Sequence, residues 1–328
     1  MLFRSQGIRY VRAAAVNTDN YYQAAAKFVA TEEWDWIVIY NRPKYLPLVA
    51  AAAPKSLFLL SMHNEMFQSH KIDHDLACLC LERVEKVITV SKFIADGIAK
   101  LFPNYKQKLQ AVYAGVDLNR FQPRWFPETH ERRDALLAAY NLKDKQVILS
   151  VGRLTDKKGP HLLLPAMEQV IQKHPSAVLL LVGSKWYGKN EDNEYVRKIK
   201  KQAEKLGDFV RLTGFISPDK IQDYFLLGDI FVCASQWEEP LARVHYESMA
   251  TGLCTITTER GGNAEVIIPE KNGLVIQDYQ NPDAFADKIN YLLSRPKQRE
   301  EMGYHGRSLA ELYYGWHRVA SDILNILK

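Results

Sequence analysis

The sequence predicts an α/β fold made of two doubly wound, Rossmann-like domains that face a cleft. At 328 residues the chain exceeds the roughly 250 to 300 residues at which a single hydrophobic core stops growing. Short apolar runs alternate with helical patterns, and this alternation restarts after a polar stretch at 118–145. Continuous apolar strands followed by helices are typical of a parallel sheet covered on both faces. We therefore expect ligands at the carboxyl ends of the strands, in a cleft between the domains.

The composition indicates a globular protein whose partners are small and anionic. The chain is 47% hydrophobic and 25% charged, and its net charge of +5 is too mild for dedicated nucleic-acid binding. Four cysteines without zinc-type spacing fit a reducing compartment. No window approaches the ~20 apolar residues of a membrane span, and the first residues do not have the pattern of a signal peptide. We expect a cytoplasmic protein, for which peripheral membrane contact stays open.

The order of the apolar runs predicts three parts. We expect an N-terminal domain over 1–122, a C-terminal domain over 123–310, and a last helix over 311–328 that packs back on the first domain. In the first part we expect strands at 8–13, 36–40, 56–64, 86–91 and 109–117, separated by helices. In the second we expect strands at 146–152, 177–183, 209–215, 229–235 and 254–258, also separated by helices.

Two glutamates flank the start of a helix predicted over 240–251. Pro240 suits its first position, and Gly252 suits the left-handed residue that ends a helix. The first amides of such a helix are unpaired and lie at the positive end of its dipole, which favours an anion. Glu239 lies before these amides and Glu247 two turns inside the helix, where both can accept hydroxyl hydrogen bonds. A nucleotide sugar fits this pattern, but so does a helix cap beside an unrelated exposed glutamate.

Other candidate residues follow other strands. Arg153 and Lys158 lie in the loop after a strand, where cations can neutralise a departing diphosphate, although loop cations are often only solvated. Phe215 ends a further strand in "LTGF" and can receive a base. His63 stands at the end of the strand "SLFLLSMHN" and can hydrogen-bond a sugar, although a lone histidine is often structural.

A glycine pair precedes a second predicted helix start. Gly261 and Gly262 would let the backbone approach a ligand closely, and Asn263 can cap the helix that follows. The pair is weak evidence when it is taken alone.

Taken in this order, these motifs resemble the retaining glycosyltransferases of family 4, which have the GT-B fold. The matching features are the "GRLTDKKG" loop, a TGF-type strand end, a Glu-x7-Glu motif and a GG-x-x-E turn. The resemblance covers nearly the whole chain, and it implies that 1–122 is the acceptor-side domain and 123–310 the nucleotide-sugar-binding domain. Within that family, the segments "NRPK", "HNEMF", "YAGVDLNRFQPRW", "GSKWYG" and "SQWEEPLARVHYESMATGL" look like the spore-coat group of bacilli.

The resemblance implies a role for each matching position. Arg153 and Lys158 match residues that bind the donor diphosphate, Glu239 the residue that contacts the donor sugar, and Glu247 the residue that holds the ribose. His63 matches a residue near the transferred sugar, so the implied catalytic set is His63, Arg153, Lys158 and Glu239. The implied donor-binding set, with backbone amides of 242–244 meeting phosphate, is Gly152, Thr213, Gly214, Phe215, Leu241, Ala242, Arg243, Val244 and Glu247.

The reaction implied by the resemblance moves a sugar from a nucleoside diphosphate sugar, with a UDP-sugar expected, to an unknown acceptor. The configuration of the sugar would be retained, and neither a metal nor a cofactor would be required. The acceptor would be a carbohydrate, a glycan-lipid or a protein in cell-envelope polysaccharide chemistry. Association with a spore coat or with the inner membrane surface is compatible with this resemblance.

Two departures from the family pattern matter. Many members have "EPFGL" where this chain has "EPLAR", so Ala242 replaces a glycine that lets the backbone approach phosphate. The family also begins with a strand and a glycine-rich loop, and no such segment precedes Ile8. We therefore expect the first domain to be truncated at its front.

Three functional hypotheses follow. The intact set of Arg153, Lys158, Glu239 and Glu247 favours an active transferase. The missing front loop favours a spore-coat or other structural protein with a degenerate or weakly active fold. An epimerase on the same fold is less favoured, because extra acid or base residues are not evident.

Overall fold

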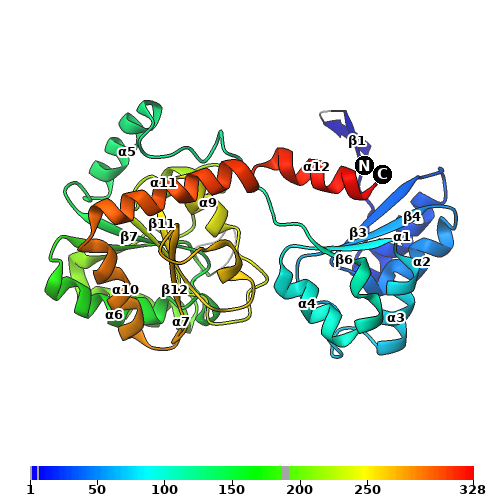
Figure 1. Cartoon of the computed structure of the whole chain (residues 1–328), viewed down its shortest axis with the longest axis horizontal. Helices are drawn as coiled ribbons and strands as arrows, with labels where there is room; N and C mark the ends of the chain where they lie inside the picture. The colour runs from blue at the N-terminus through cyan, green and yellow to red at the C-terminus, as the bar shows by residue number, and fades with distance from the viewer. Residues whose placement is uncertain (1, 6, 186–191) are drawn as a thin grey trace. The chain divides into compact units, whose positions relative to one another are not determined.

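A computed structural model describes residues 2–5, 7–185 and 192–328 of the chain (Figure 1). The chain divides into two compact units, each described by itself below. Unit 1 comprises Met1–Tyr113 and Asp322–Lys328, and unit 2 comprises Ala114–Ser321. The domain ranges expected from the sequence stay a prediction.

Unit 1 contains a parallel sheet of four strands in the order β3-β4-β5-β6. Its strands are apolar because both faces are covered, and Phe58, Leu59 and Leu60 on β4 have no exposed surface. Two of its helices begin at side-chain caps, since Asp73 accepts hydrogen bonds from the first turn of α3 and Ser91 from that of α4. The strands are β3 Trp36–Tyr40, β4 Leu57–Met62, β5 Lys86–Thr89 and β6 Leu109–Ala111. The helices are α1 Thr18–Val29, α2 Leu46–Ala52, α3 His74–Arg83 and α4 Lys92–Leu101, with 3-10 turns η1 Pro43–Tyr45 and η2 Pro103–Lys108.

The first predicted strand forms, but outside the parallel sheet. β2 (Ile8–Val11) pairs antiparallel with β1 (Leu2–Ser5) in a separate two-stranded sheet. Ile8 is 57% and Val11 42% exposed, so this segment does not have the buried faces that a parallel strand requires. The prediction that it opens the parallel sheet was therefore wrong.

Unit 2 contains a parallel sheet of six strands in the order β12-β11-β10-β7-β8-β9. The chain enters at β7, runs outward to β9, returns to β10 beside β7 and runs outward the other way. The reversal between β7 and β10 is a topological switch point, where doubly wound sheets bind ligands. The strands are β7 Gln146–Val151, β8 Ala177–Val182, β9 Val210–Leu212, β10 Ile230–Cys233, β11 Cys254–Thr258 and β12 Gly273–Ile276.

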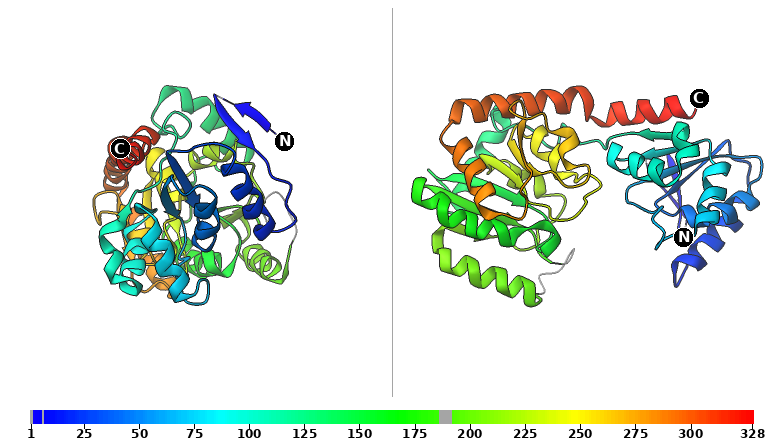
Figure 2. Two further views of the ribbon diagram at one scale, coloured as in Figure 1. Left: turned by 90° about the vertical axis from the view of Figure 1, so that its right-hand side faces the viewer. Right: turned by 60° about the horizontal axis from the view of Figure 1, so that its bottom comes forward.

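Helices cover both faces of the sheet in unit 2 (Figure 2). α6, α7 and α10 pack together on one face, while α9 and α11 pack together on the other. The core between sheet and helices is aliphatic, with Leu163, Met167 and Ile256 fully buried. The helices are α5 Pro127–Ala139, α6 Pro160–Lys173, α7 Glu194–Leu206, α8 Ile221–Phe225, α9 Val244–Ala250, α10 Pro282–Leu293 and α11 Pro296–Tyr313. The last helix, α12 Trp316–Ile326, begins in unit 2, and its residues from Asp322 onward belong to unit 1. The 3-10 turns are η3 Asp156–Lys158, η4 Gly207–Phe209 and η5 Asn263–Val266.

Three details of unit 2 differ from the predictions. The helix predicted over 240–251 begins only at Val244, and the amide of Ala242 before it bonds to the side chain of Asn263. The strand expected to reach Phe215 ends at Leu212. Strand β12 was not predicted, because its four residues are too few to show a regular alternation of apolar and polar side chains. Among the described residues, no helix has the length and apolar character to cross a membrane.

Candidate functional site

Two adjoining cavities lie in unit 2 at the carboxyl ends of its strands. The first has a volume of about 480 Å³ and is lined in part by Phe215, Ile216, Pro218, Ile221 and Trp316; we call it the apolar lobe. The second has a volume of about 350 Å³ and contains Lys158 and Glu239; we call it the charged lobe. Both lobes are lined by Val151, Gly152, Arg153, Arg243 and Glu247, so they form one cleft at the switch point.

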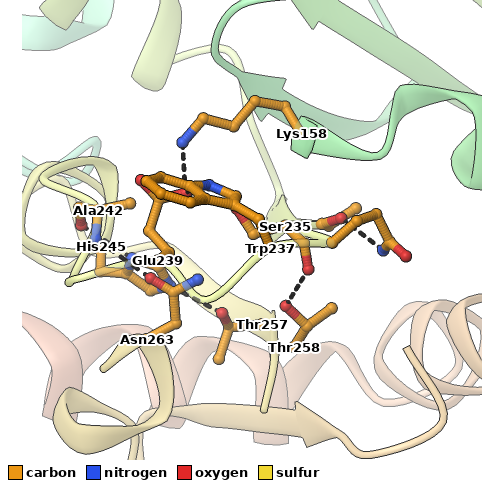
Figure 3. Close-up of polar contacts among 11 residues, drawn as sticks. Lys158, Ser235, Trp237, Glu239, Ala242, His245, Thr257, Thr258 and Asn263 are labelled. Atoms are coloured by element: carbon orange, nitrogen blue, oxygen red, sulfur yellow. Dashed lines mark hydrogen bonds and ion pairs between the residues drawn. The ribbon is translucent and has the colours of Figure 1, made fainter. Parts of the chain in front are cut away.

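The charged lobe is organised around Glu239 (Figure 3). One oxygen of this carboxylate, Oε2, accepts hydrogen bonds from Lys158 Nζ at 2.5 Å, Ser235 Oγ at 2.6 Å and Trp237 Nε1 at 2.8 Å. The exposed fractions of the two charged side chains are 21% for Lys158 and 11% for Glu239. Three donors on one largely buried oxygen hold the carboxylate in a single position.

These contacts also set the ionisation of Glu239. Burial alone would raise the pKa of this carboxyl, but the charge of Lys158 and the three hydrogen bonds outweigh burial and lower the pKa below its ordinary value. Glu239 is therefore an ionised acceptor of hydrogen bonds near neutral pH.

A left-handed glycine places Lys158 in the lobe. Gly159 follows Lys158 with φ of 71°, and a Cβ atom at this position would lie 2.0 Å from the carbonyl oxygen of Ala234. Only glycine fits this close approach between the η3 turn and the end of β10. The turn holds the ammonium of Lys158 over the segment that carries Glu239.

The glycine pair predicted to approach a ligand instead packs on the backbone of Glu239. Gly261 has φ of 59°, and a Cβ atom there would lie 2.0 Å from the carbonyl oxygen of Glu239. The amide of Gly262 donates to that same oxygen at 2.8 Å. The amide of Gly261 donates to Glu238 Oε2 at 2.6 Å, and Arg260 pairs with Glu238. The pair therefore fixes the main chain that carries the charged lobe.

Asn263 does not cap the helix that follows it, because its side chain holds the segment before α9. Its Oδ1 accepts from the amide of Ala242 at 3.1 Å, and the residue before η5 is Gly262. This bond takes up one of the amides that the sequence assigned to phosphate.

A buried histidine, His245, contacts the segment before α9 through the carbonyl oxygen of Ala242. His245 Nδ1 lies 2.9 Å from the carbonyl oxygen of Ala242, and Nε2 lies 2.8 Å from Thr257 Oγ1. Because a carbonyl only accepts, Nδ1 carries the proton and Nε2 accepts from the threonine hydroxyl. Burial lowers the pKa of His245 to about 4. This neutral ring ties α9 to β11 and orients Ala242.

Glu247 lines both lobes from the first turn of α9. Burial raises the pKa of its carboxyl, and the positive charges of Arg243 and Arg120 oppose that rise only in part. Arg120 is held in place by two hydrogen bonds of 2.9 Å to Gln222 Oε1. Arg243 lies 6.0 Å from the ring centre of Trp316.

Most of the predicted site residues come together in this cleft. The described lining includes Gly152, Arg153, Lys158, Phe215, Glu239, Leu241, Ala242, Arg243, Val244 and Glu247. Thr213 and Gly214 are not part of the lining: Thr213 Oγ1 donates to the carbonyl oxygen of Gly214 at 2.9 Å, and that same oxygen accepts from the amide of Gly183. They shape the sheet edge behind the cleft.

His63 lies in unit 1, after β4; the residue is exposed as a whole, but partial burial of its ring lowers its pKa. Its Nε2 is 3.1 Å from Ser61 Oγ, and its amide donates to Asn41 Oδ1 at 2.7 Å. Asn41 also accepts from the amide of Asn64 and has φ of 53°. The loop that carries His63 is therefore fixed by Asn41, which the sequence analysis did not single out.

Several residues of the apolar lobe were missed at the sequence level. Arg120 and Phe121 come from the polar stretch at 118–145, Asp117 from the end of the strand predicted over 109–117, and Trp316 from the last predicted helix. The segment "GVD" at 115–117, which ends a predicted strand, was the one sequence feature that could have indicated a ligand contact in this region. In the "GSKWYG" segment, residues 186–188 lie outside the described residues. Among the described residues, no group of three or more His, Cys, Asp or Glu is placed to hold a metal ion.

A two-sheet architecture with a donor-type cleft at the switch point of one unit defines the GT-B class of glycosyltransferases, and solved structures agree. Anabaena HepE, solved in complex with UDP, superposes with a TM-score of 0.79 over 94% of this chain and 81% of its own, at 19% identity. The likeness at this identity shows the fold.

Sequence comparisons give the family. The model of the family "Glycosyl transferases group 1" matches residues 133–309. Spore coat protein SA of Bacillus subtilis is 41% identical over 98% of this chain and 84% of its own length. The putative glycosyltransferase YtcC of the same organism is 38% identical over 97% of this chain and 77% of its own. The chain belongs to the group 1 glycosyltransferase family.

Proposed function

We propose that this protein transfers a sugar from a nucleoside diphosphate sugar, with UDP as the expected nucleotide, to a carbohydrate or glycan-bearing acceptor. The observation that carries the proposal is the two-lobed cleft. A fixed, ionised Glu239 lies in the charged lobe, Glu247 lines both lobes, and Arg153 lines both as well. A nucleoside diphosphate sugar has its base at one end, an anionic diphosphate in the middle and a hydroxyl-rich sugar at the other end. This order matches the apolar lobe, the region shared by the two lobes and the charged lobe.

The apolar lobe is the proposed nucleoside site. Phe215, Ile216 and Pro218 offer flat or aliphatic surface for a base, and the carboxylate of Glu247 can accept from ribose hydroxyls. The UDP bound in the HepE structure supports a uridine nucleotide as the first ligand to test.

The region shared by the lobes is the proposed diphosphate site. Arg153 is exposed at the cleft, and Lys158 lies at the end of η3 within the charged lobe. Their positive charges would stabilise the negative charge that develops on the departing diphosphate. Because these side chains supply charge, we propose that no metal is obligatory.

The charged lobe is the proposed sugar site. The bond between the anomeric carbon and the β-phosphate oxygen breaks, and the acceptor oxygen bonds to the same face of that carbon, so configuration is retained. The acceptor proton passes to the departing phosphate oxygen. Glu239 takes no proton; it accepts hydroxyl hydrogen bonds and orients the ring. His63 is proposed to contact the transferred sugar, and the amides of Ala242 to Val244 the phosphate.

The pairing of Lys158 with Glu239 implies an exchange on donor binding. A diphosphate competes for the ammonium of Lys158, and sugar hydroxyls can take its place on the Glu239 carboxylate. The amide of Ala242 donates to Asn263 Oδ1, so it would have to break this hydrogen bond, or divide it between two acceptors, in order to donate to a phosphate oxygen.

The test is a calorimetric titration with UDP-, GDP- and ADP-sugars, followed by proton NMR of the released or transferred sugar with and without EDTA. We expect binding of one nucleotide class, an anomeric configuration equal to that of the donor, and no effect of the chelator. Lys158→Ala or Glu239→Ala would lower turnover about a hundredfold or more, whereas Lys173→Ala, at an exposed lysine on α6, would leave it unchanged. Failure of every nucleotide sugar to bind would rule out the proposal.

A second candidate function is a structural protein of the spore coat. The 41% identity to spore coat protein SA favours this candidate. It predicts that the protein binds a nucleotide sugar weakly or not at all and shows no turnover with any acceptor. The transferase proposal places the protein in the cytoplasm or at the inner membrane surface, and the structural one in the coat, so fractionation of the native host separates them.

A further inference from the structure

A third cavity of unit 2 lies at the amino ends of the strands of the same sheet. It has a volume of about 560 Å³ and lies beside Asp229, which precedes β10, and Gly252, which precedes β11. The donor-type cleft lies instead at the carboxyl ends of the strands. The full lining is Arg124, Trp125, His130, Arg133, Asp134, Asp229, Gly252, Arg299, Glu300 and Tyr304.

Three arginines make the interior of this cavity positive. Burial lowers the pKa of both Arg133 and Arg299, and the charge of Arg124 lowers each further, while Asp229 acts in the opposite direction. The guanidinium of Arg124 is therefore close enough to repel that of Arg133 and that of Arg299, and all three groups are partly removed from water.

Internal partners compensate only part of this charge, because one largely buried carboxylate faces three arginines. Asp229 is committed, since one of its oxygens accepts from Arg124 Nη1 at 2.9 Å and the other from the amide of Val147 at 2.8 Å. Arg299 is only 7% exposed, and its Nε and Nη1 atoms are buried without a hydrogen-bond partner among the described residues. Because these two atoms have almost no accessible surface, an anion in the cavity acts on them through its charge, and a buried guanidinium without such compensation is costly.

The acidic residues of the cavity lie at its rim. Asp134 and Glu300 are exposed, so water screens their charges, while Arg299 lies inside. Arg299 also stands in the first turn and a half of α11, an 18-residue helix whose N-terminal end adds positive potential. The interior therefore attracts an anion.

An aromatic wall completes the site. The rings of Trp125 and Tyr304 lie 4.1 Å apart between centroids at an angle of 41°, and both line the cavity. Gly252 allows this arrangement, since a Cβ atom there would lie 2.2 Å from the ring of Trp125. The volume lies in the range of about 300–1,000 Å³ that is usual for small-molecule sites and exceeds what phosphate alone needs.

We propose that this cavity binds a small organic phosphate, with its phosphate among Arg124, Arg133 and Arg299 and its organic part against Trp125 and Tyr304. Guanidinium groups pair with phosphate oxygens through two parallel hydrogen bonds, and aromatic faces accept flat or ring-shaped groups. This site is separate from the proposed donor site and does not depend on the proposed function.

The experiment titrates the UDP-saturated protein with glucose 1-phosphate, inorganic phosphate and glucose, and maps hydrogen–deuterium exchange. We expect glucose 1-phosphate to bind, inorganic phosphate to bind more weakly, and glucose not to bind. Exchange would slow at residues 124–134 and 299–304, with no change at 151–158. Protection only at 151–158 would place the phosphate in the donor cleft and overturn the proposal.

Matched variants on α5 test the charge argument without disturbing the buried Arg299. Arg133→Gln removes a cation of the site and should weaken binding about tenfold or more. Asp134→Asn removes a rim anion and should strengthen binding. Arg132→Gln, at a neighbour that pairs with Asp223 and does not line the cavity, should leave binding unchanged. Equal effects of the two arginine variants, or no binding of any phosphate, would contradict the site.

Discussion

In the charged lobe one oxygen of Glu239 accepts three hydrogen bonds, whereas in the apolar lobe Glu247 is balanced only by the more distant charges of Arg243 and Arg120. Both glutamates are largely removed from water, yet the pKa of Glu239 is lowered and that of Glu247 is raised. The difference shows that direct partners outweigh burial at Glu239, whereas burial raises the pKa of Glu247, whose charged neighbours oppose it only in part. The two residues should therefore respond differently to substitution.

The largest effect is expected from removal of the cation that pairs with Glu239. Lys158→Met leaves a carboxylate that is only 11% exposed without its counter-charge, so the free energy of unfolding should fall by about 3–5 kcal/mol. Urea denaturation measures this loss. Adding Glu239→Gln to the same protein should recover most of it, and Lys173→Met should change stability by less than about 0.5 kcal/mol. A loss under about 1 kcal/mol would show that the pair is solvated.

The second effect concerns the histidine that supports the charged lobe. The folded state holds the pKa of His245 at about 4 against an ordinary value of 6.5, so the unfolded chain binds the proton first as pH falls. This contribution is complete above pH 6.5 and is lost as pH falls to about 4, a change of about 3 kcal/mol.

The measurement compares urea unfolding of the parent protein and of His245→Gln between pH 7 and pH 4. The variant should be less stable at pH 7, but its stability should fall less steeply with pH. Parallel pH profiles for the two proteins would contradict a neutral, buried His245.

Glu247 should show the opposite sign. Its raised pKa means that the folded state binds a proton more readily than the unfolded chain, so its contribution to stability is present below its unfolded pKa and is lost as pH rises. Glu247→Gln should therefore be at least as stable as the parent at neutral pH while binding UDP about tenfold more weakly, or about 1.4 kcal/mol. Glu168→Gln, at an exposed position on α6, is the charge-matched control.

The smallest effect is expected at Trp237. Trp237→Phe removes one of the three donors to Glu239 and keeps an aromatic ring, so stability should fall by about 1 kcal/mol. Chemical denaturation followed by circular dichroism measures this without relying on tryptophan emission. A change as large as that of Lys158→Met would show that the indole, not the ammonium, holds the carboxylate.

The sequence predicted the fold well where apolar runs were continuous. Short continuous apolar segments such as "AVLLLVG" predicted strands that are buried on both faces. The regular alternation of such segments with helical patterns predicted the helices between them. The motif residues at strand ends could be found because parallel strands bring their carboxyl ends together. This reasoning placed Arg153, Lys158, Glu239 and Glu247 around one cleft.

The rest depended on contacts between distant segments. Pro240 and Gly252 are ordinary helix boundary signals, yet the helix begins only at Val244, and the Ala242 amide before it bonds to Asn263, 21 positions away. No local pattern encodes that bond. The same holds for Asn41, which holds the loop of His63, and for Arg120, which is held at the apolar lobe by Gln222 across 102 positions of sequence.

The central claim is that Glu239 meets the donor sugar and Glu247 the ribose. Calorimetry with UDP and with the preferred UDP-sugar, on the parent protein, Glu239→Gln and Glu247→Gln, tests this directly. The account predicts that Glu247→Gln weakens both ligands by the same factor, whereas Glu239→Gln weakens only the UDP-sugar. Equal weakening of UDP by both substitutions, or no difference between UDP and the UDP-sugar in Glu239→Gln, would contradict it.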